Sequence, residues 1–191
     1  MVPVQFFTLP LTPAEVETQV QQALTAGCRW ITLRFTDDTT DADAEPAARR
    51  IVTACHKQGV IVLTEGRAEL CRTIEADGVH MSDGSMTSVQ VREMLGGEHG
   101  HAAIVGCNAS GDTEALVAFG KQGADYAIVT AEANDFPILC DALHKAGIRL
   151  PLCVEENDVA NVGSLLEAGV QGIVTSNVSL IESLLAADDG K

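Results

Sequence analysis

Short apolar segments recur along the chain at intervals of about two dozen residues, and each is rich in valine and isoleucine. Eight such segments lie at residues 4–9, 30–35, 60–63, 78–81, 102–107, 126–130, 150–154 and 172–175. Most are continuously apolar rather than alternating, which is typical of parallel strands that are covered on both faces. The pattern therefore predicts eight parallel strands.

Segments with helical periodicity separate the predicted strands. In residues 13–26, for example, Val16, Val20, Ala23 and Leu24 recur at the spacing that places them on one face of a helix. Most of these segments end at a glycine, which favours the left-handed backbone of a helix C-terminus. These glycines are Gly27, Gly59, Gly123, Gly147 and Gly169. The starts are marked by the N-cap residues Thr12, Asp112 and Asp158, while the acidic stretch 37–45 precedes a helix that we predict to begin near Pro46.

Eight strand–helix units in 191 residues predict a single α/β domain, a small parallel eight-stranded (β/α)8 barrel that spans residues 1–191, with a frayed tail from about residue 186. A doubly wound open sheet is the alternative, although such sheets usually have fewer strands.

The composition of the chain argues against several classes of function. The chain carries 12 basic and 27 acidic side chains, a formal charge of −15, which argues against binding to nucleic acid or to an anionic membrane surface. No apolar run is long enough to span a membrane and the start lacks a secretory signal, so we expect a cytoplasmic protein. The six cysteines show no zinc-ligand spacing and are expected to be reduced core residues. The oligomeric state stays open, with a homo-oligomer among the alternatives.

In a (β/α)8 barrel the residues at the C-terminal ends of the strands line the active site. The candidate ligand-binding residues at these positions are Arg34, Thr64, Asn108, Glu155, Glu156 and Ser176, and the candidate metal ligands are Glu65 and Asp83. Arg34 could clamp a phosphate or pair with Glu65 on the next strand. The carboxylates could hold a metal or a cationic ligand, or form a solvated acidic rim. His80 lies in an apolar run, where a hydrogen-bonded packing role competes with that of a base.

Several of these segments resemble one known family. The matching motifs are GCRWITLR (27–34), ADGVHM (76–81), VGCN (105–108), GADY (123–126) and residues 168–176. Together they resemble thiamine phosphate synthases and the related TenI-type thiazole tautomerases. The resemblance implies a (β/α)8 barrel and a function in thiamine biosynthesis: a transferase that joins a pyrimidine pyrophosphate to a thiazole phosphate and releases pyrophosphate. It also implies Mg²⁺ as the cofactor that neutralises the departing pyrophosphate.

The resemblance also assigns roles at the rim. Arg34 corresponds to the arginine that holds the pyrophosphate, Glu65 to an aspartate that ligates Mg²⁺, and Ser176 to part of the thiazole phosphate site. The second metal-ligating aspartate of the family falls on Ser85, and Asp83 is close by in sequence. Two glycines whose backbone amides approach that phosphate in the family are replaced here by Glu155 and Glu156.

Carboxylates at these positions repel a phosphate. We therefore expect a thiamine phosphate synthase-like protein whose active site has diverged. The alternatives are a catalytically degenerate barrel that binds a small ligand or a partner protein, and an enzyme that acts on a cationic or metal-bound substrate.

Overall fold

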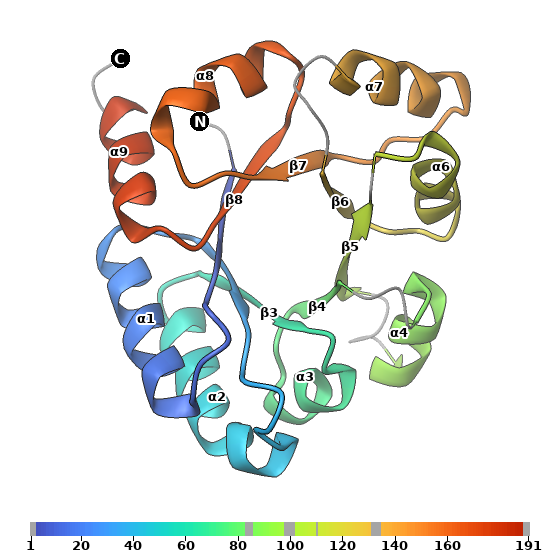
Figure 1. Cartoon of the computed structure of the whole chain (residues 1–191). Coiled ribbons are helices and arrows are strands. Elements are labelled where there is room, and N and C mark those ends of the chain that lie inside the picture. Colours follow the sequence, from blue (N-terminus) through green and yellow to red (C-terminus); the bar gives the residue numbers. More distant parts are fainter. Residues whose placement is uncertain (1–2, 83–85, 98–101, 110, 131–134, 189–191) are drawn as a thin grey trace.

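The chain folds into a closed barrel of eight parallel strands surrounded by helices (Figure 1). This computed structural model describes residues 3–82, 86–97, 102–109, 111–130 and 135–188. The strands follow one another around the barrel in chain order, and the last pairs with the first. They are β1 Val4–Phe7, β2 Trp30–Leu33, β3 Ile61–Glu65, β4 Gly78–Met81, β5 Ile104–Ala109, β6 Tyr126–Val129, β7 Leu152–Glu155 and β8 Gly172–Thr175. The predicted (β/α)8 barrel is confirmed.

The helices alternate with the strands and form the outer layer in Figure 1. They are α1 Pro13–Thr25, α2 Asp41–His56, α3 Ala68–Ile74, α4 Ser88–Leu95, α6 Thr113–Lys121, α7 Phe136–Lys145, α8 Val159–Glu167 and α9 Val178–Asp188. Helix α2 starts before Pro46, so that predicted boundary was wrong. A proline favours the first turn of a helix, but the Thr40 side chain accepts the backbone N–H of Asp43 and sets the start instead.

Apolar side chains fill two layers, one between the strands and the helices and one inside the barrel. The inner cluster consists of Phe7, Leu63, Tyr126, Ile128, Cys153 and Val174, with Trp30 and Ile104 packed against it. All six cysteines are free thiols. Burial raises the pKa of Cys71, Cys107 and Cys153 to about 12, so these thiols act as small packing groups.

The residue before each of β4, β6 and β8 clamps the preceding strand at the N-terminal end of the barrel. Each clamp residue makes two hydrogen bonds to one residue of the preceding strand. Its side-chain oxygen accepts the backbone N–H of that strand residue at 2.7 Å, and its own backbone N–H donates to the carbonyl of the same strand residue at 2.8 Å. The pairs are Asp77 with Val62, Asp125 with Val105 and Gln171 with Leu152. Because each clamp joins two strands, it fixes their register at the end opposite the predicted site.

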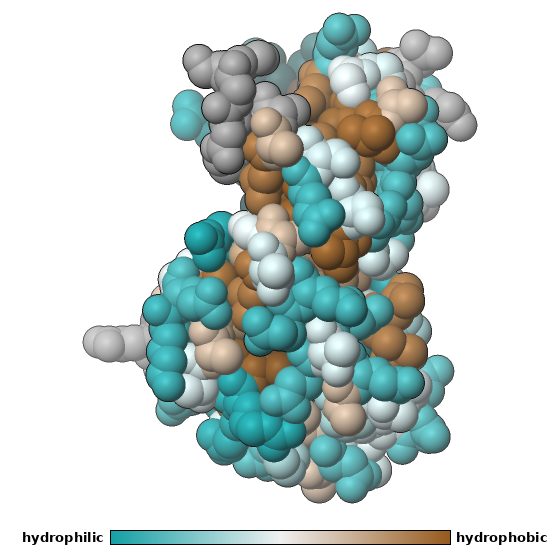
Figure 2. All heavy atoms as spheres, turned by 90° about the vertical axis from the view of Figure 1, so that its left-hand side faces the viewer, coloured by the Kyte–Doolittle hydropathy of each residue, from teal (hydrophilic) through white to brown (hydrophobic). Residues whose placement is uncertain are grey.

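The outer face that carries α1 and α9 is shown in Figure 2. Hydrophilic residues predominate on its lower half, and hydrophobic residues show in the hollow between the halves and in the upper half. Within the described part of the chain, no helix combines the length and the apolar character that crossing a membrane requires.

Candidate functional site at the barrel mouth

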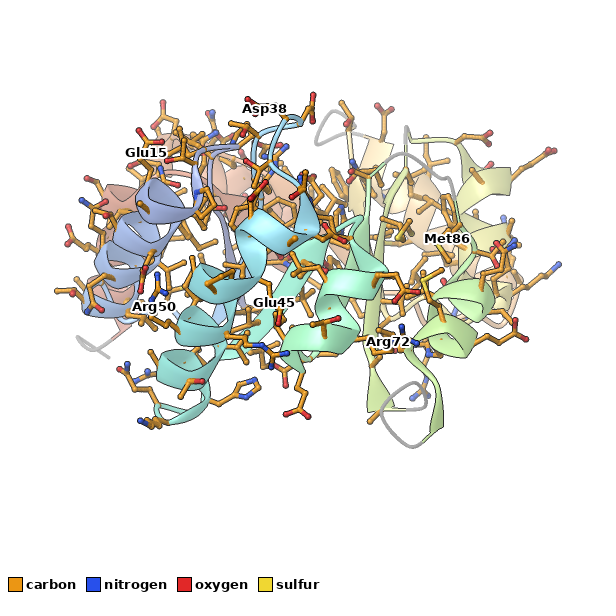
Figure 3. The ribbon with its side chains drawn as sticks, turned by 90° about the horizontal axis from the view of Figure 1, so that it is seen from below. Glu15, Asp38, Glu45, Arg50, Arg72 and Met86 are labelled. Carbon is orange, nitrogen blue, oxygen red and sulfur yellow. The ribbon has the colours of Figure 1, made fainter. Side chains whose placement is uncertain are left out.

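The C-terminal ends of the strands form one mouth of the barrel. Successive side chains of a strand point to opposite faces, so the residue two places after an inward-facing one also faces inward. Leu63, Cys153 and Val174 belong to the inner cluster. The positions two residues further along β3 and β7 belong to Glu65 and Glu155, which therefore face the mouth, and Ser176 directly follows the end of β8. In Figure 3, which looks across the barrel, Asp38 in the loop after β2 and Glu15 in the first turn of α1 mark this end.

Arg34 and Glu65 form an ion pair at the mouth. Arg34 Nε lies 2.8 Å from Glu65 Oε2, and the two side chains are 28% and 20% exposed. The guanidinium carbon lies 5.6 Å from the centre of the Phe7 ring. Thr8 fixes the backbone beneath the pair, because its buried hydroxyl accepts the Arg34 N–H at 2.7 Å. Arg34 was expected either to clamp a phosphate or to pair with Glu65, and the described geometry is that of the pair.

The expected magnesium ligands do not assemble into a metal site in the described part of the chain. One carboxylate oxygen of Glu65 accepts a hydrogen bond from Arg34 Nε. Asp83 lies outside the described residues. Among the residues that the structure describes, no group of three or more His, Cys, Asp or Glu side chains is placed to hold a metal ion. Mg²⁺ is usually held by one or two carboxylates together with water and substrate phosphates. Glu65, the candidate ligand that the structure describes, already pairs with Arg34, so the described donor set does not favour Mg²⁺.

The loops after β7 and β8 are closed by hydrogen bonds to the chain's own side chains. Glu156 Oε1 accepts the backbone N–H groups of Asn157 and Asp158, each at 2.8 Å. The Asn157 side-chain oxygen accepts the Ser176 N–H at 3.2 Å and the Thr175 hydroxyl at 2.8 Å. Oxygen atoms of this protein thus occupy three backbone amides at or beside positions 155, 156 and 176, to which the family resemblance assigns a substrate phosphate. Glu155 is exposed at the end of β7.

A buried polar network crosses the barrel below the mouth. His80, which is 0% exposed, has Nδ1 at 3.0 Å from the Tyr126 hydroxyl and Nε2 at 3.0 Å from Asn108 Oδ1. Gln5 Nε2 donates to Tyr126 at 2.9 Å and to the Thr32 hydroxyl at 2.7 Å. Burial lowers the pKa of His80 to about 4, with a smaller lowering by the Arg34 charge that is opposed by the hydrogen bond to Asn108. His80 is therefore a neutral, hydrogen-bonded group at neutral pH.

Thr64 does not face the mouth, which corrects its place among the candidates. It is 0% exposed, and its hydroxyl donates to the Arg67 carbonyl at 3.2 Å. Its neighbour Glu65 faces inward, so the alternation of the strand turns Thr64 toward the helix layer. Asn108 lies inside β5 rather than after it, because β5 extends to Ala109. Its side chain is exposed and contacts His80.

Two further parts of the site were missing from the candidates. Asn157 follows β7 among the rim residues, yet sequence alone gives no sign that its side chain reaches across to the end of β8. The inner layer of Gln5 and Tyr126 lies within apolar strands, and each residue is at most 2% exposed. A polar residue inside an apolar strand is the signal that could have found this layer.

Comparison with known proteins identifies the family. A family model described as thiamine monophosphate synthase matches residues 8–133. The chain belongs to this family. Its relatives include a thiamine-phosphate synthase from Bacteroides fragilis, 28% identical over 195 residues that cover 94% of this chain and 93% of the relative. Another, from Geobacillus kaustophilus, is 31% identical over 161 residues, with coverages of 78% and 68%.

A solved structure supports the same fold. The thiamine phosphate pyrophosphorylase from Pyrococcus furiosus superimposes with a TM-score of 0.80 and covers 99% of this chain and 96% of that one, at 15% sequence identity. At this identity the likeness concerns the fold alone. Together with the family match and the relatives, it confirms the predicted resemblance: the protein is thiamine phosphate synthase-like and linked by its family to thiamine biosynthesis.

Proposed function

We propose that this member of the family binds a small, non-phosphorylated ligand of the thiamine type at the barrel mouth and does not join the two phosphorylated precursors. The observation that carries the proposal is the position of Glu156, whose carboxylate accepts the amides of Asn157 and Asp158 at 2.8 Å. A phosphate would have to displace this anion from donors that it already satisfies, and would also meet the charge of the displaced group.

The charges around the mouth support the same conclusion. Binding several phosphate charges requires cations or free amides aimed at them. Arg34 is paired with Glu65, and segments 83–85, 110 and 131–134, which lie outside the described residues, contain no lysine or arginine. Because Arg34 neutralises Glu65, the remaining acidic charge of the described mouth residues comes from Glu155 and Glu156 at the end of β7. A field of this sign favours a cation, and thiamine is a cationic heteroaromatic molecule.

Calorimetric titration of the whole protein tests the proposal. We expect heat of binding with thiamine and none with thiazole phosphate, and no thiamine phosphate from the two precursors with Mg²⁺ present. Glu156→Gly, which frees the two amides, is expected to bind thiazole phosphate. Glu93→Gln, at an exposed position on α4, removes the same charge elsewhere and is the control. Thiazole phosphate binding to the unaltered protein, or a failure to bind thiamine, would overturn the proposal.

The Arg34–Glu65 pair provides a second test. Glu65→Gln leaves Arg34 without its carboxylate partner, and a released guanidinium is suited to hold a pyrophosphate. We expect pyrophosphate to stabilise Glu65→Gln against heat but not the unaltered protein, since a ligand that binds only the folded state raises its stability. An equal stabilisation of both proteins would contradict the inference that the pair occupies Arg34.

A further inference from the structure

The placement of the Gln5 amide, whose Nε2 donates while its buried Oε1 has no partner among the described groups, sets one direction of donation for the network below the mouth. Both hydrogens of the Gln5 amide are used, one on Thr32 and one on the Tyr126 oxygen. Since Tyr126 already accepts from Gln5, its own O–H is free to donate to Nδ1 of His80, 3.0 Å away. A neutral imidazole that accepts at Nδ1 carries its proton on Nε2. That proton points at Asn108 Oδ1, 3.0 Å away.

The Tyr126 ring is held in place by its packing. A Cβ atom added to Gly106 would lie 2.1 Å from Tyr126 Cζ, so the ring lies directly against the bare backbone of β5. Trp30 packs edge-on against the Tyr126 ring, with 4.8 Å between the ring centroids. His80 stacks on it at 5.6 Å, and Phe7 contacts the imidazole edge-on at 5.1 Å. These contacts leave the hydroxyl and the imidazole few alternative positions.

We propose that His80 is a positioning residue for Asn108: its Nε2–H fixes the Asn108 oxygen toward the barrel, so that the Asn108 amide presents N–H donors to a ligand at the mouth. The exposed Asn108 Nδ2 lies 3.4 Å from the Ser82 carbonyl, which engages at most one of its two hydrogens. The remaining hydrogen can donate to an acceptor atom of the ligand, which in a thiamine-type ligand is a heteroaromatic ring nitrogen or a hydroxyl oxygen. This assignment of the ligand rests on the proposed function above.

The first experiment needs no ligand. Long-range proton–nitrogen correlation spectra of the ¹⁵N-labelled protein at neutral pH should show His80 in the Nε2–H form alone. Tyr126→Phe removes the donor to Nδ1, so a mixture of the two tautomers is expected in that variant. Thr64→Val, which removes a buried hydroxyl on the outer side of β3, should leave the His80 spectrum unchanged. A proton on Nδ1 in the unaltered protein would overturn the inference, whatever the protein binds.

The second experiment measures thiamine affinity by calorimetry. Glutamine can place a donor near the position of Nε2, whereas asparagine reaches only that of Nδ1. We expect His80→Gln to keep the affinity within about twofold and His80→Asn to lose about fivefold, the usual effect of one neutral hydrogen bond. In Asn108→Leu the additional change His80→Asn should have no effect on affinity. Equal losses in His80→Gln and His80→Asn would mean that His80 only supports the fold.

The two experiments separate the hypotheses. If thiamine does not bind while His80 is held as the Nε2–H tautomer, the proposed function fails and the positioning of Asn108 stands. If thiamine binds and His80→Asn binds it as tightly as the unaltered protein, the positioning fails and the proposed function stands.

Discussion

Acid should destabilise this barrel through His80. The folded state takes up a proton at His80 with a pKa of about 4, because the imidazole is buried, whereas the unfolded chain does so near the ordinary value of 6.5. Between these values the unfolded state binds more protons, so stability rises with pH and is lost as pH falls. From about pH 7 to pH 5 the two pKa values correspond to a loss of about 2 kcal/mol from this residue alone.

Urea unfolding at each pH, with His80→Gln beside the unaltered protein, isolates this contribution. The variant keeps every other titratable group, so subtracting its pH dependence removes the effect of the carboxylates and the remaining histidines. Measurement at pH 5 stays above the isoelectric point of about 4.5. If the free energies of unfolding of the two proteins change in parallel to within about 0.5 kcal/mol, His80 titrates normally in the folded state and the reasoning from burial is refuted.

Two stability predictions follow from the packing of the strands. Gly106→Ala should lower the free energy of unfolding by about 1–3 kcal/mol, because the new methyl would lie 2.1 Å from a Tyr126 ring carbon. The control Gly163→Ala on α8 places its methyl in open space, so urea unfolding should show an unchanged or higher stability. Asp125→Ala should lower the free energy of unfolding by about 2 kcal/mol, because the Val105 amide of its clamp loses its acceptor. Asp141→Ala, which removes an exposed ion pair with Lys145, should lower it by less than about 0.5 kcal/mol. Equal costs within either pair of variants would contradict these explanations.

The pattern of apolar segments was enough to predict the barrel. Continuous apolar runs are typical of parallel strands. The glycines at the helix ends have the expected left-handed backbone, with φ of +88° at Gly27 and +82° at Gly123. Strand ends were predicted less well. Strand β5 reaches Ala109, because Asn108 and Ala109 continue the ladder opposite β6. Their polar and small side chains give no sign of this in the sequence.

The site was predicted only in part, because its geometry depends on contacts between distant residues. The spacing of strand ends located Arg34, Glu65, Asn108 and Glu155 at the mouth. It could not decide that Arg34 pairs with Glu65, since both a phosphate clamp and an ion pair are chemically reasonable. Thr64 was misplaced because a one-residue shift along a strand reverses the face to which a side chain points.

The motifs that resemble the family and the residues that depart from it lie at different levels of the same barrel. Asp77 and Asp125, within ADGVHM and GADY, clamp strands at the N-terminal end, while His80 and Tyr126 of the same motifs form the inner polar layer. These residues lie below the rim and contribute to strand pairing and to the packing inside the barrel. The departures, such as Glu156, lie at the rim, where side chains can change without disturbing strand pairing. Under the proposed function, the family's fold is kept while carboxylates replace an anion site at the mouth, and the ligand must be inferred from the rim.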